Sequence, residues 1–251
     1  MIDVIWVEAL KLRRSTVGVI STAAIVIGTL AILGGITAAL ASGDPAIVSK
    51  VGPVASTLDW DGLLAAAAQI TSAGGFVGFG VVLSWMVGRE FTDGTITGLF
   101  ALPVSRSRIA AAKLAVYAVW SVAVSLMLCA GILLLGLALG YGLPGTDAWE
   151  ALGRQWILGV LTAAAAVPVA WIATIARSIL AAIGATIGLV VVAQVGALTG
   201  SGGWIPAAAP ALWALSGGDA ASAAQLGVTI AAAAAFGALT TWSWGRLQLN
   251  R

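Results

Sequence analysis

The sequence predicts an all-α membrane protein with six transmembrane helices and both termini in the cytoplasm. The first observation is composition: 60% of the 251 residues are hydrophobic and only 9% are charged, with a mean hydropathy of +1.05. Ordinary soluble domains carry about 25% charged residues, and no soluble fold of this length could bury so much apolar surface. The other two observations are the spacing of the apolar stretches and the placement of Lys and Arg.

Six stretches are apolar over about the 20 residues that a bilayer-crossing helix needs. They cover roughly 17–40, 63–87, 114–139, 156–176, 178–199 and 224–245, and none has Asp, Glu, Lys or Arg in its interior. The joins are short, so residues 1–251 are expected to form one membrane domain. Ala39-Leu40-Ala41 resembles a signal-peptide cleavage site, but the apolar run before it exceeds the usual ~7–15 residues. An uncleaved first span is therefore expected.

Lys and Arg gather in alternate connecting segments, which predicts the orientation. With the N-terminus in the cytoplasm, ten of the twelve lie inside: Lys11, Arg13, Arg14, Arg89, Arg106, Arg108, Lys113, Arg177, Arg246 and Arg251. Only Lys50 and Arg154 lie outside. This is the bias of the positive-inside rule, and most Asp and Glu residues, such as Asp44, fall on the outer side.

Several of the eleven Trp residues lie at the ends of predicted spans, where aromatic side chains form belts at the two membrane–water interfaces. Those at the predicted outer ends are Trp60, Trp149, Trp156 and Trp204, and those at the inner ends are Trp85, Trp242 and Trp244.

Residues 1–16 predict a cytoplasmic N-terminal interfacial helix. One side carries Ile2, Ile5, Trp6, Ala9 and Leu10, and the opposite side carries Asp3, Glu8, Lys11 and Arg14. Such a helix lies along the membrane surface with its apolar side in the lipid. Arg13 falls within the apolar arc, which is unusual for this arrangement.

The cytoplasmic segment 88–113 holds six ionic side chains: Arg89, Glu90, Asp93, Arg106, Arg108 and Lys113. Asp93-Gly94 is a turn signal, Thr95 can cap a helix, and Pro103 ends it. Ile96, Leu99 and Phe100 share one helical face. The segment therefore predicts a short helix outside the bilayer. A bare connector can be as short as 176–178, so this longer insert is expected to dock a cytosolic partner; a plain loop is the alternative.

The chain lacks the residues that most enzymes and ion-driven carriers need. It has no histidine, a single cysteine (Cys129) and no G-x-x-x-x-G-K-[ST] loop, so no metal, cofactor or catalytic site is expected within it. Ion-driven carriers generally need ionisable groups near the midplane. The strongest polar or amphipathic candidates for lining a pathway are Gln69, Gln194, Trp120 and Trp171, with helix packing as the alternative role.

The stretch GREFTDGTITGLFALPVSRSRIAAAK resembles the segment after the second span in permease subunits of type-2 ATP-binding cassette (ABC) exporters, the six-span bacterial family. The matching residues are Gly88, Arg89, Glu90, Gly94, Thr95, Leu99, Leu102 to Arg106, and Lys113. The N-terminal stretch VEALKLRRST also resembles that family, whose members begin with a short cytoplasmic helix.

The resemblance implies that the region around Glu90 to Phe100 is a coupling helix seated on a separate ATPase subunit. The implied interface comprises Arg89, Glu90, Asp93, Gly94, Thr95, Ile96, Leu99, Phe100 and Arg106. It also implies two permease copies and two ATPases, which would bind the ATP and magnesium. Substrate would pass between the membrane halves along spans two and five, and residues 200–223 would form extracellular, partly re-entrant helices.

The expected function is an ATP-driven exporter permease in a bacterial plasma membrane. The uncharged spans favour a hydrophobic or amphipathic cargo such as a drug, antibiotic or peptide, moved by alternating access and conferring resistance by efflux. The permease would pair with itself or with a second permease, surrounded by membrane lipid, and nothing indicates nucleic-acid binding. The alternative is a non-transporting assembly or sensory subunit that docks a cytosolic partner; a secondary carrier is disfavoured by the uncharged spans.

Overall fold

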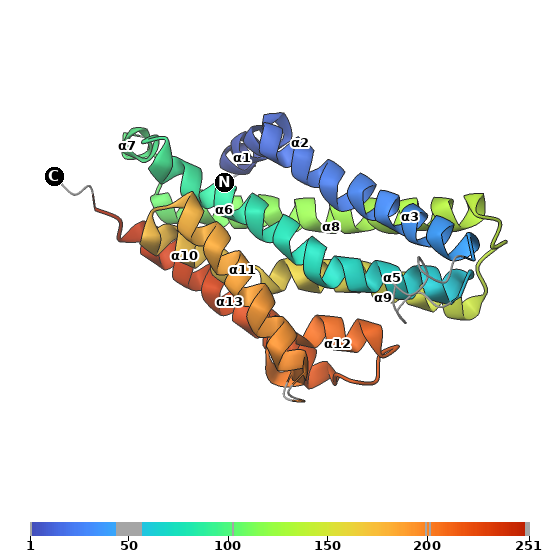
Figure 1. Cartoon of the computed structure of the whole chain (residues 1–251). Helices are drawn as coiled ribbons and strands as arrows, with labels where there is room; N and C mark the ends of the chain where they lie inside the picture. Colours follow the sequence, from blue (N-terminus) through green and yellow to red (C-terminus); the bar gives the residue numbers. More distant parts are fainter. Residues whose placement is uncertain (1, 44–56, 102, 199, 201, 249–251) are drawn as a thin grey trace.

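The computed structural model describes residues 2–43, 57–101, 103–198, 200 and 202–248, and every regular element in these ranges is helical (Figure 1). Six helical stretches of the described chain are long and apolar enough to cross a membrane: Thr16–Ala41, Trp60–Thr92, Arg106–Ala138, Thr146–Ala176, Ile179–Leu198 and Ala223–Gly245. The predicted all-α class with six spans is confirmed. Asp44, Lys50 and Arg251, whose side of the membrane is predicted from charge, lie outside the described residues.

The N-terminal helix α1 (Ile2–Arg14) is separated from the first span by a bend at Ser15. Ser15 has extended backbone, with ψ 143°, and its Oγ accepts a hydrogen bond from the Gly18 amide at 2.8 Å. This N-cap satisfies a backbone donor that the start of a helix leaves free. The span then runs through α2 (Thr16–Ala23), the π-helical turn η1 (Ala24–Gly28) and α3 (Thr29–Ala41).

The second span also contains a π-helical turn. It comprises α5 (Trp60–Ile70), η3 (Thr71–Gly75) and α6 (Phe76–Thr92), and η3 contacts η1 of the first span. Asp59 caps α5 by accepting hydrogen bonds from the Gly62 amide at 2.9 Å and from the Thr57 hydroxyl at 2.7 Å. The hydrogen bond from Gly62, and then that from Thr57, lowers the pKa of the Asp59 carboxyl. The short helix α7 (Ile96–Leu99) and the third span α8 (Arg106–Ala138) follow.

The fourth span is broken into α9 (Thr146–Ala165) and α10 (Pro168–Ala176). Pro168 has no backbone N–H to continue the hydrogen-bond ladder and occupies the first turn of the new helix, where proline is tolerated. Arg177 ends α10 in the left-handed conformation, with φ 51°, so that α11 (Ile179–Leu198) starts almost at once.

Two short helices, η4 (Gly202–Trp204) and α12 (Ala209–Leu215), connect α11 to the last span α13 (Ala223–Gly245). α12 packs against α5, α9 and α13. The described part of residues 200–223 thus contains the short helices that the sequence favours, and their re-entrant position in a membrane stays a prediction.

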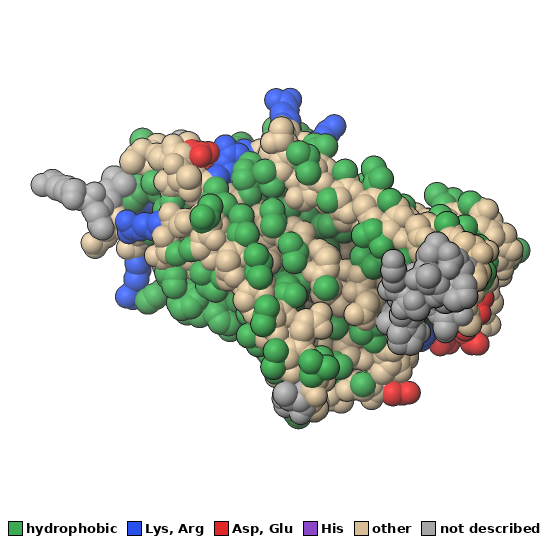
Figure 2. Space-filling model, viewed as in Figure 1, with side chains coloured by type: hydrophobic (Ala, Val, Ile, Leu, Met, Phe, Trp, Pro, Cys, Tyr) green, Lys and Arg blue, Asp and Glu red, His purple; other side chains and the backbone are tan. Residues whose placement is uncertain are grey.

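The two ends of the bundle differ in charge. Figure 1 shows α7, α1 and the C-terminal end of α13 toward one end of the bundle, which we call the α7 end. In the view of Figure 2, Lys and Arg side chains gather mainly at the α7 end and Asp and Glu mainly at the other, with apolar side chains between. By the positive-inside rule, the α7 end is predicted to face the cytoplasm.

The buried apolar side chains form two clusters along the bundle. One lies toward the α7 end and includes Phe76, Phe79, Val82, Leu83, Tyr117, Val169 and Trp244. The other includes Leu33, Trp60, Leu63, Leu128, Ile132 and Leu152. α6 and α11 approach closely where Gly80 faces Thr186, and a Cβ at Gly80 would overlap the Thr186 side chain.

Two of the tryptophans predicted to lie in interfacial belts are buried instead. Trp60 packs over Gly136 and makes an edge contact with Tyr141, with ring centroids 6.1 Å apart. Trp244 is fully buried, and its indole N–H donates to the Thr174 hydroxyl at 3.0 Å. The belt prediction was wrong for these two residues, because position along a helix does not indicate which face a side chain occupies.

Replacing Gly80 with Leu is expected to destabilise the chain by about 1–3 kcal/mol, the usual cost of overpacking a core. The new side chain would overlap Thr186 and push α6 away from α11. The measurement is the thermal unfolding midpoint of the detergent-purified protein, followed by tryptophan fluorescence. Gly184→Leu is the matched control, since Gly184 lies on α11 with open space around it. Equal midpoints for the two variants would contradict this packing.

Candidate functional site

The segment between α6 and α8 forms a compact projection at the α7 end of the bundle (Figure 1). Asp93 ends α6, and Gly94 reverses the chain with φ 69°, a left-handed conformation that glycine adopts at no steric cost. α7 then makes a single helical turn before the chain enters α8. The helix expected at 95–100 is therefore present, although short.

Four charged side chains meet beneath this projection. They are Glu8 and Lys11 of α1, Glu90 of α6 and Lys113 of α8, which we call the charge cluster. The Lys113 Nζ lies 2.7 Å from both Glu8 Oε2 and Glu90 Oε1. The Lys11 Nζ lies 2.7 Å from Glu8 Oε1 and 3.3 Å from Glu90 Oε1. Each cation therefore contacts both carboxylates.

Burial makes the charge cluster energetically consequential. Lys113, Glu90 and Glu8 are only 1%, 2% and 4% exposed, whereas Lys11 is partly open to solvent. A buried ion is tolerated only where its charge is balanced and its hydrogen bonds are satisfied. Here two carboxylates face two ammonium groups, and the formal charge sums to zero. Burial lowers the pKa of Lys11, but Glu8 and Glu90 outweigh it, so this pKa lies above its usual value.

The charge cluster is bonded directly to the projecting segment. The Thr95 hydroxyl, immediately before α7, donates a hydrogen bond of 2.5 Å to Glu90 Oε2. On the opposite side, the Lys113 ammonium lies 6.0 Å from the centroid of the buried Trp244 ring, in the range of a cation–π contact. The start of α7 is thus connected through Glu90 to α1, α8 and the end of α13.

The other residues of the predicted coupling interface occupy distinct positions. Arg89 lies over the Trp85 ring at 4.6 Å and pairs with Asp93 at 3.7 Å. Ile96 and Leu99 are half-buried and pack against the apolar cluster of the α7 end. Their shared helical face therefore points partly into the protein.

Phe100 and Arg106 connect this segment to the C-terminal part of the chain. The Arg106 guanidinium lies 4.2 Å from the centre of the Phe100 ring. It also donates hydrogen bonds to the backbone carbonyls of Leu247 and Gly245. Among residues 93–101, the exposed ones include Asp93, Gly94, Thr97, Gly98 and Ala101.

Sequence reasoning missed the charge cluster as a unit. The sequence predicts Glu8 and Lys11 on the polar side of an interfacial helix and Lys113 at the end of the cytoplasmic segment 88–113. In the structure Glu8 and Lys11 face α6 and α8, whereas Asp3 and Arg14 are exposed, and Lys113 is buried between the two carboxylates. One local signal was available: Glu8 and Lys11 are three residues apart, a spacing at which opposite charges pair on a helix.

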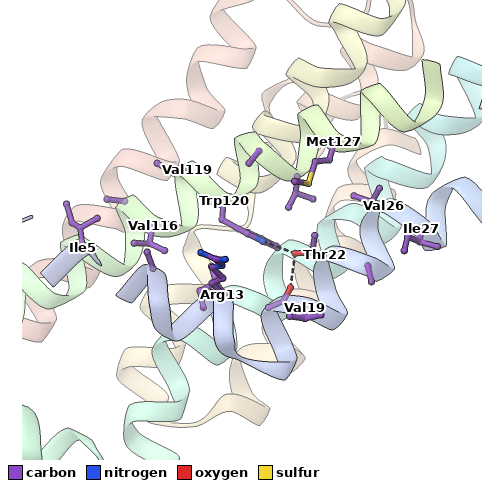
Figure 3. A pocket seen from close by; sticks show the side chains of 17 residues that line it. Ile5, Arg13, Val19, Thr22, Val26, Ile27, Val116, Val119, Trp120 and Met127 are labelled. Carbon is purple, nitrogen blue, oxygen red and sulfur yellow. Dashed lines mark hydrogen bonds between the residues drawn. The ribbon is translucent and has the colours of Figure 1, made fainter. Parts of the chain in front are cut away.

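The four pathway candidates lie on different elements. Trp120 lines an apolar groove between the first span and α8 (Figure 3), and Trp171 packs against Phe236 with ring centroids 5.7 Å apart. Gln69 on α5 and Gln194 on α11 are exposed on the surface of the single chain. A pathway role for these residues stays a prediction. Within the described residues, no group of three or more His, Cys, Asp or Glu side chains could hold a metal ion.

Comparison with known proteins gives one family. The model of a family described as ABC-2 family transporter protein matches residues 4–193, a range that includes most of α1, all of α7 and the whole charge cluster. Comparison with curated proteins and with solved structures finds no match.

Replacing Lys113 with Met is expected to destabilise the protein by about 3–5 kcal/mol, because it leaves Glu8 and Glu90 buried beside one another with only Lys11 to neutralise them. The thermal unfolding midpoint of the purified protein measures the effect. Arg108→Met, on the first turns of the same helix, is the control, since Arg108 is exposed. If both variants unfold at the wild-type temperature, the charge cluster does not stabilise the fold.

Proposed function

Because the chain belongs to the ABC-2 transporter family, whose model matches residues 4–193, we propose that it is the permease subunit of an ATP-driven exporter. A separate ATPase subunit would bind and hydrolyse ATP with magnesium. Two permease copies would move a hydrophobic or amphipathic compound, such as a drug, antibiotic or peptide, out of a bacterial cell. The site of action would be the plasma membrane.

The observation that carries the proposal is the connection of α7 to the charge cluster. α7 lies outside the bundle, at the end predicted to be cytoplasmic, and Thr95 at its start is bonded to Glu90. Glu90 is in turn paired with Lys11 of α1 and Lys113 of α8. A force applied to α7 by an ATPase would therefore reach α6, α1 and α8 together. This is the mechanical requirement of a permease whose energy enters from outside the membrane domain.

The contact with the ATPase would use the exposed side of the projection. Thr97, Gly98 and Ala101, which we call the outer face of α7, are exposed, whereas Ile96 and Leu99 pack inward. We therefore place the first ATPase contact at the outer face of α7, with Asp93 and Gly94 at its edge. Glu90 would act from within, by holding Thr95 and the three helices in register.

The distribution of exposed amides supports pairing of two permeases. Gln69 and Gln194 lie on the second and fifth spans, and both are exposed on the single chain. An amide exposed to lipid tails cannot satisfy its hydrogen bonds, whereas amides between helices can bond across the contact. A second copy facing α5 and α11 would cover these groups, and closure and opening of that interface would give alternating access for the cargo.

Gly98→Arg should abolish recovery of the ATPase with the tagged permease. Gly98 is exposed and has no atoms within 4 Å of an added Cβ, so the substitution fits the free chain and obstructs only a docked partner. The measurement is affinity purification from native membranes in a mild detergent, with quantitative mass spectrometry. An ABC ATPase should be recovered with the wild-type permease in a one-to-one ratio.

Asp3→Arg is the matched control, because it adds the same side chain at an exposed position on α1. It should leave ATPase recovery at the wild-type level. Recovery of no ATPase with the wild-type chain, under conditions that preserve membrane complexes, would overturn the permease proposal in favour of a non-transporting docking subunit. Undiminished recovery with Gly98→Arg would overturn the placement of the contact on α7.

Thr95→Val should lower transport several-fold while leaving the ATPase bound. The substitution removes the hydrogen bond to Glu90, whose net worth to a charged acceptor is about 1.5–3 kcal/mol, and keeps the shape of the side chain. The measurement is cargo efflux per ATP hydrolysed in proteoliposomes that contain the permease and its ATPase. Thr92→Val is the control, since Thr92 bonds only to the Gly88 carbonyl of its own helix. Equal efflux per ATP for both variants would exclude a coupling role for the Thr95–Glu90 bond.

A further inference from the structure

An apolar groove runs along the outside of the bundle between the N-terminal region and the third span (Figure 3). Its volume is about 810 Å³, and its walls come from α1, α2, η1 and α8. Small side chains on both walls, including Ala23, Ala115 and Ala123, create the space. The volume falls within the roughly 300–1,000 Å³ of sites that bind small molecules. The groove lies apart from Gln69 and Gln194, which mark the proposed interface between copies.

The walls offer almost no free hydrogen-bonding group. Trp120 donates its indole N–H to the Thr22 hydroxyl at 3.0 Å, and Thr22 donates to the Gly18 carbonyl at 2.7 Å (Figure 3). Apart from these two side chains and Arg13, every lining side chain is apolar or glycine. An occupant of the groove must therefore be apolar over most of its length, since a buried polar group without a partner is costly.

Arg13 provides the single charge at the lining of the groove. It is exposed, and among the described residues it makes no hydrogen bond or ion pair. Figure 3 shows its guanidinium group turned toward the α8 wall, near Val116 and Trp120. This position explains why an arginine falls on the apolar side of α1: that side, with Ile5 and Ala9, faces the groove. A guanidinium is well suited to a phosphate, which it can bind through two parallel hydrogen bonds.

The length of the groove matches one leaflet of a bilayer. Along α8 it extends from Ala115 to Met127, a separation of twelve positions, or about 18 Å at 1.5 Å per residue. Half of the roughly 30 Å hydrocarbon core is about 15 Å. Arg13 lies at the α7 end, which the charge distribution predicts to be cytoplasmic, and the apolar part extends from there toward the middle of the membrane.

We propose that this groove is a binding site for an anionic phospholipid of the cytoplasmic leaflet. One acyl chain lies between the first span and α8, and the headgroup phosphate binds Arg13. The lipid contacts α1 and α8 beside the charge cluster, since Leu12 lines the groove and also borders Glu8, Lys11 and Lys113. The site does not depend on the transport reaction, and its occupant is a resident lipid rather than the cargo.

Native mass spectrometry of the full chain in detergent tests the site by titration with phosphatidylglycerol and, in parallel, with phosphatidylcholine of the same acyl chains. Wild type is expected to bind one phosphatidylglycerol per chain about tenfold more tightly than phosphatidylcholine, because the choline cation of phosphatidylcholine offsets the charge of the phosphate that Arg13 binds. Arg13→Gln should remove this preference, and Arg13→Lys should retain most of it.

Arg14→Gln is the matched control, because Arg14 is the next residue, is exposed and does not line the groove. It should bind lipid as wild type does. Ala123→Phe fills the groove without changing charge and should weaken binding of both lipids several-fold, with the thermal unfolding midpoint confirming that the variant is folded.

Four results would overturn the proposal. Equal losses for Arg13→Gln and Arg14→Gln would indicate general surface attraction of acidic lipid. Equal affinities of wild type for the two lipids, which both carry a phosphate, would exclude selection of an anionic lipid by Arg13. Unchanged binding to folded Ala123→Phe would place the acyl chain elsewhere, as would co-purification of a neutral apolar compound that neither lipid displaces.

Discussion

The architecture of the α7 end depends on one buried electrostatic arrangement, the pairing of Glu8 and Glu90 with Lys113 and Lys11. Removing these ions from water is costly, and the cost is met only while all of the partners stay in place. That condition fixes three helices that are far apart in sequence. It also explains how the short N-terminal helix α1 keeps a defined position. Lys11 pairs with Glu90 of α6, and Glu8 pairs with Lys113 of α8.

The same arrangement changes the meaning of the segment between the second and third spans. Its apolar residues Ile96 and Leu99 are the feature that suggests a docking surface from sequence alone, but they pack partly against the chain's own core. A single turn of helix cannot be stable in isolation, since nucleation is unfavourable. The inward packing, the Thr95–Glu90 hydrogen bond and the contact of Arg106 with Phe100 hold α7 in shape. What remains for a partner is the small, exposed outer face.

Hydropathy was sufficient to predict the six spans, because lipid requires long, uninterrupted apolar helices. The Asp93-Gly94 pair was sufficient to predict the turn at Gly94. Features that depend on distant partners could not be predicted. Trp60 and Trp244 are buried because of what lies opposite them, and the π-helical turns η1 and η3 contact one another across two spans without any distinct composition. The charge cluster belongs to the same class, since Glu8 and Lys113 are 105 positions apart.

Residues of α1 contribute to two neighbouring features, the charge cluster and the apolar groove. Glu8 and Lys11 face the helices that lead to α7, whereas Arg13 faces a lipid-sized groove. A rotation of α1 that suited one feature would disturb the other, because both are set by the same rigid helix. With the proposed lipid in place, the position of α1, and through it that of Glu90, would be determined jointly by the ion pairs and by the surrounding bilayer.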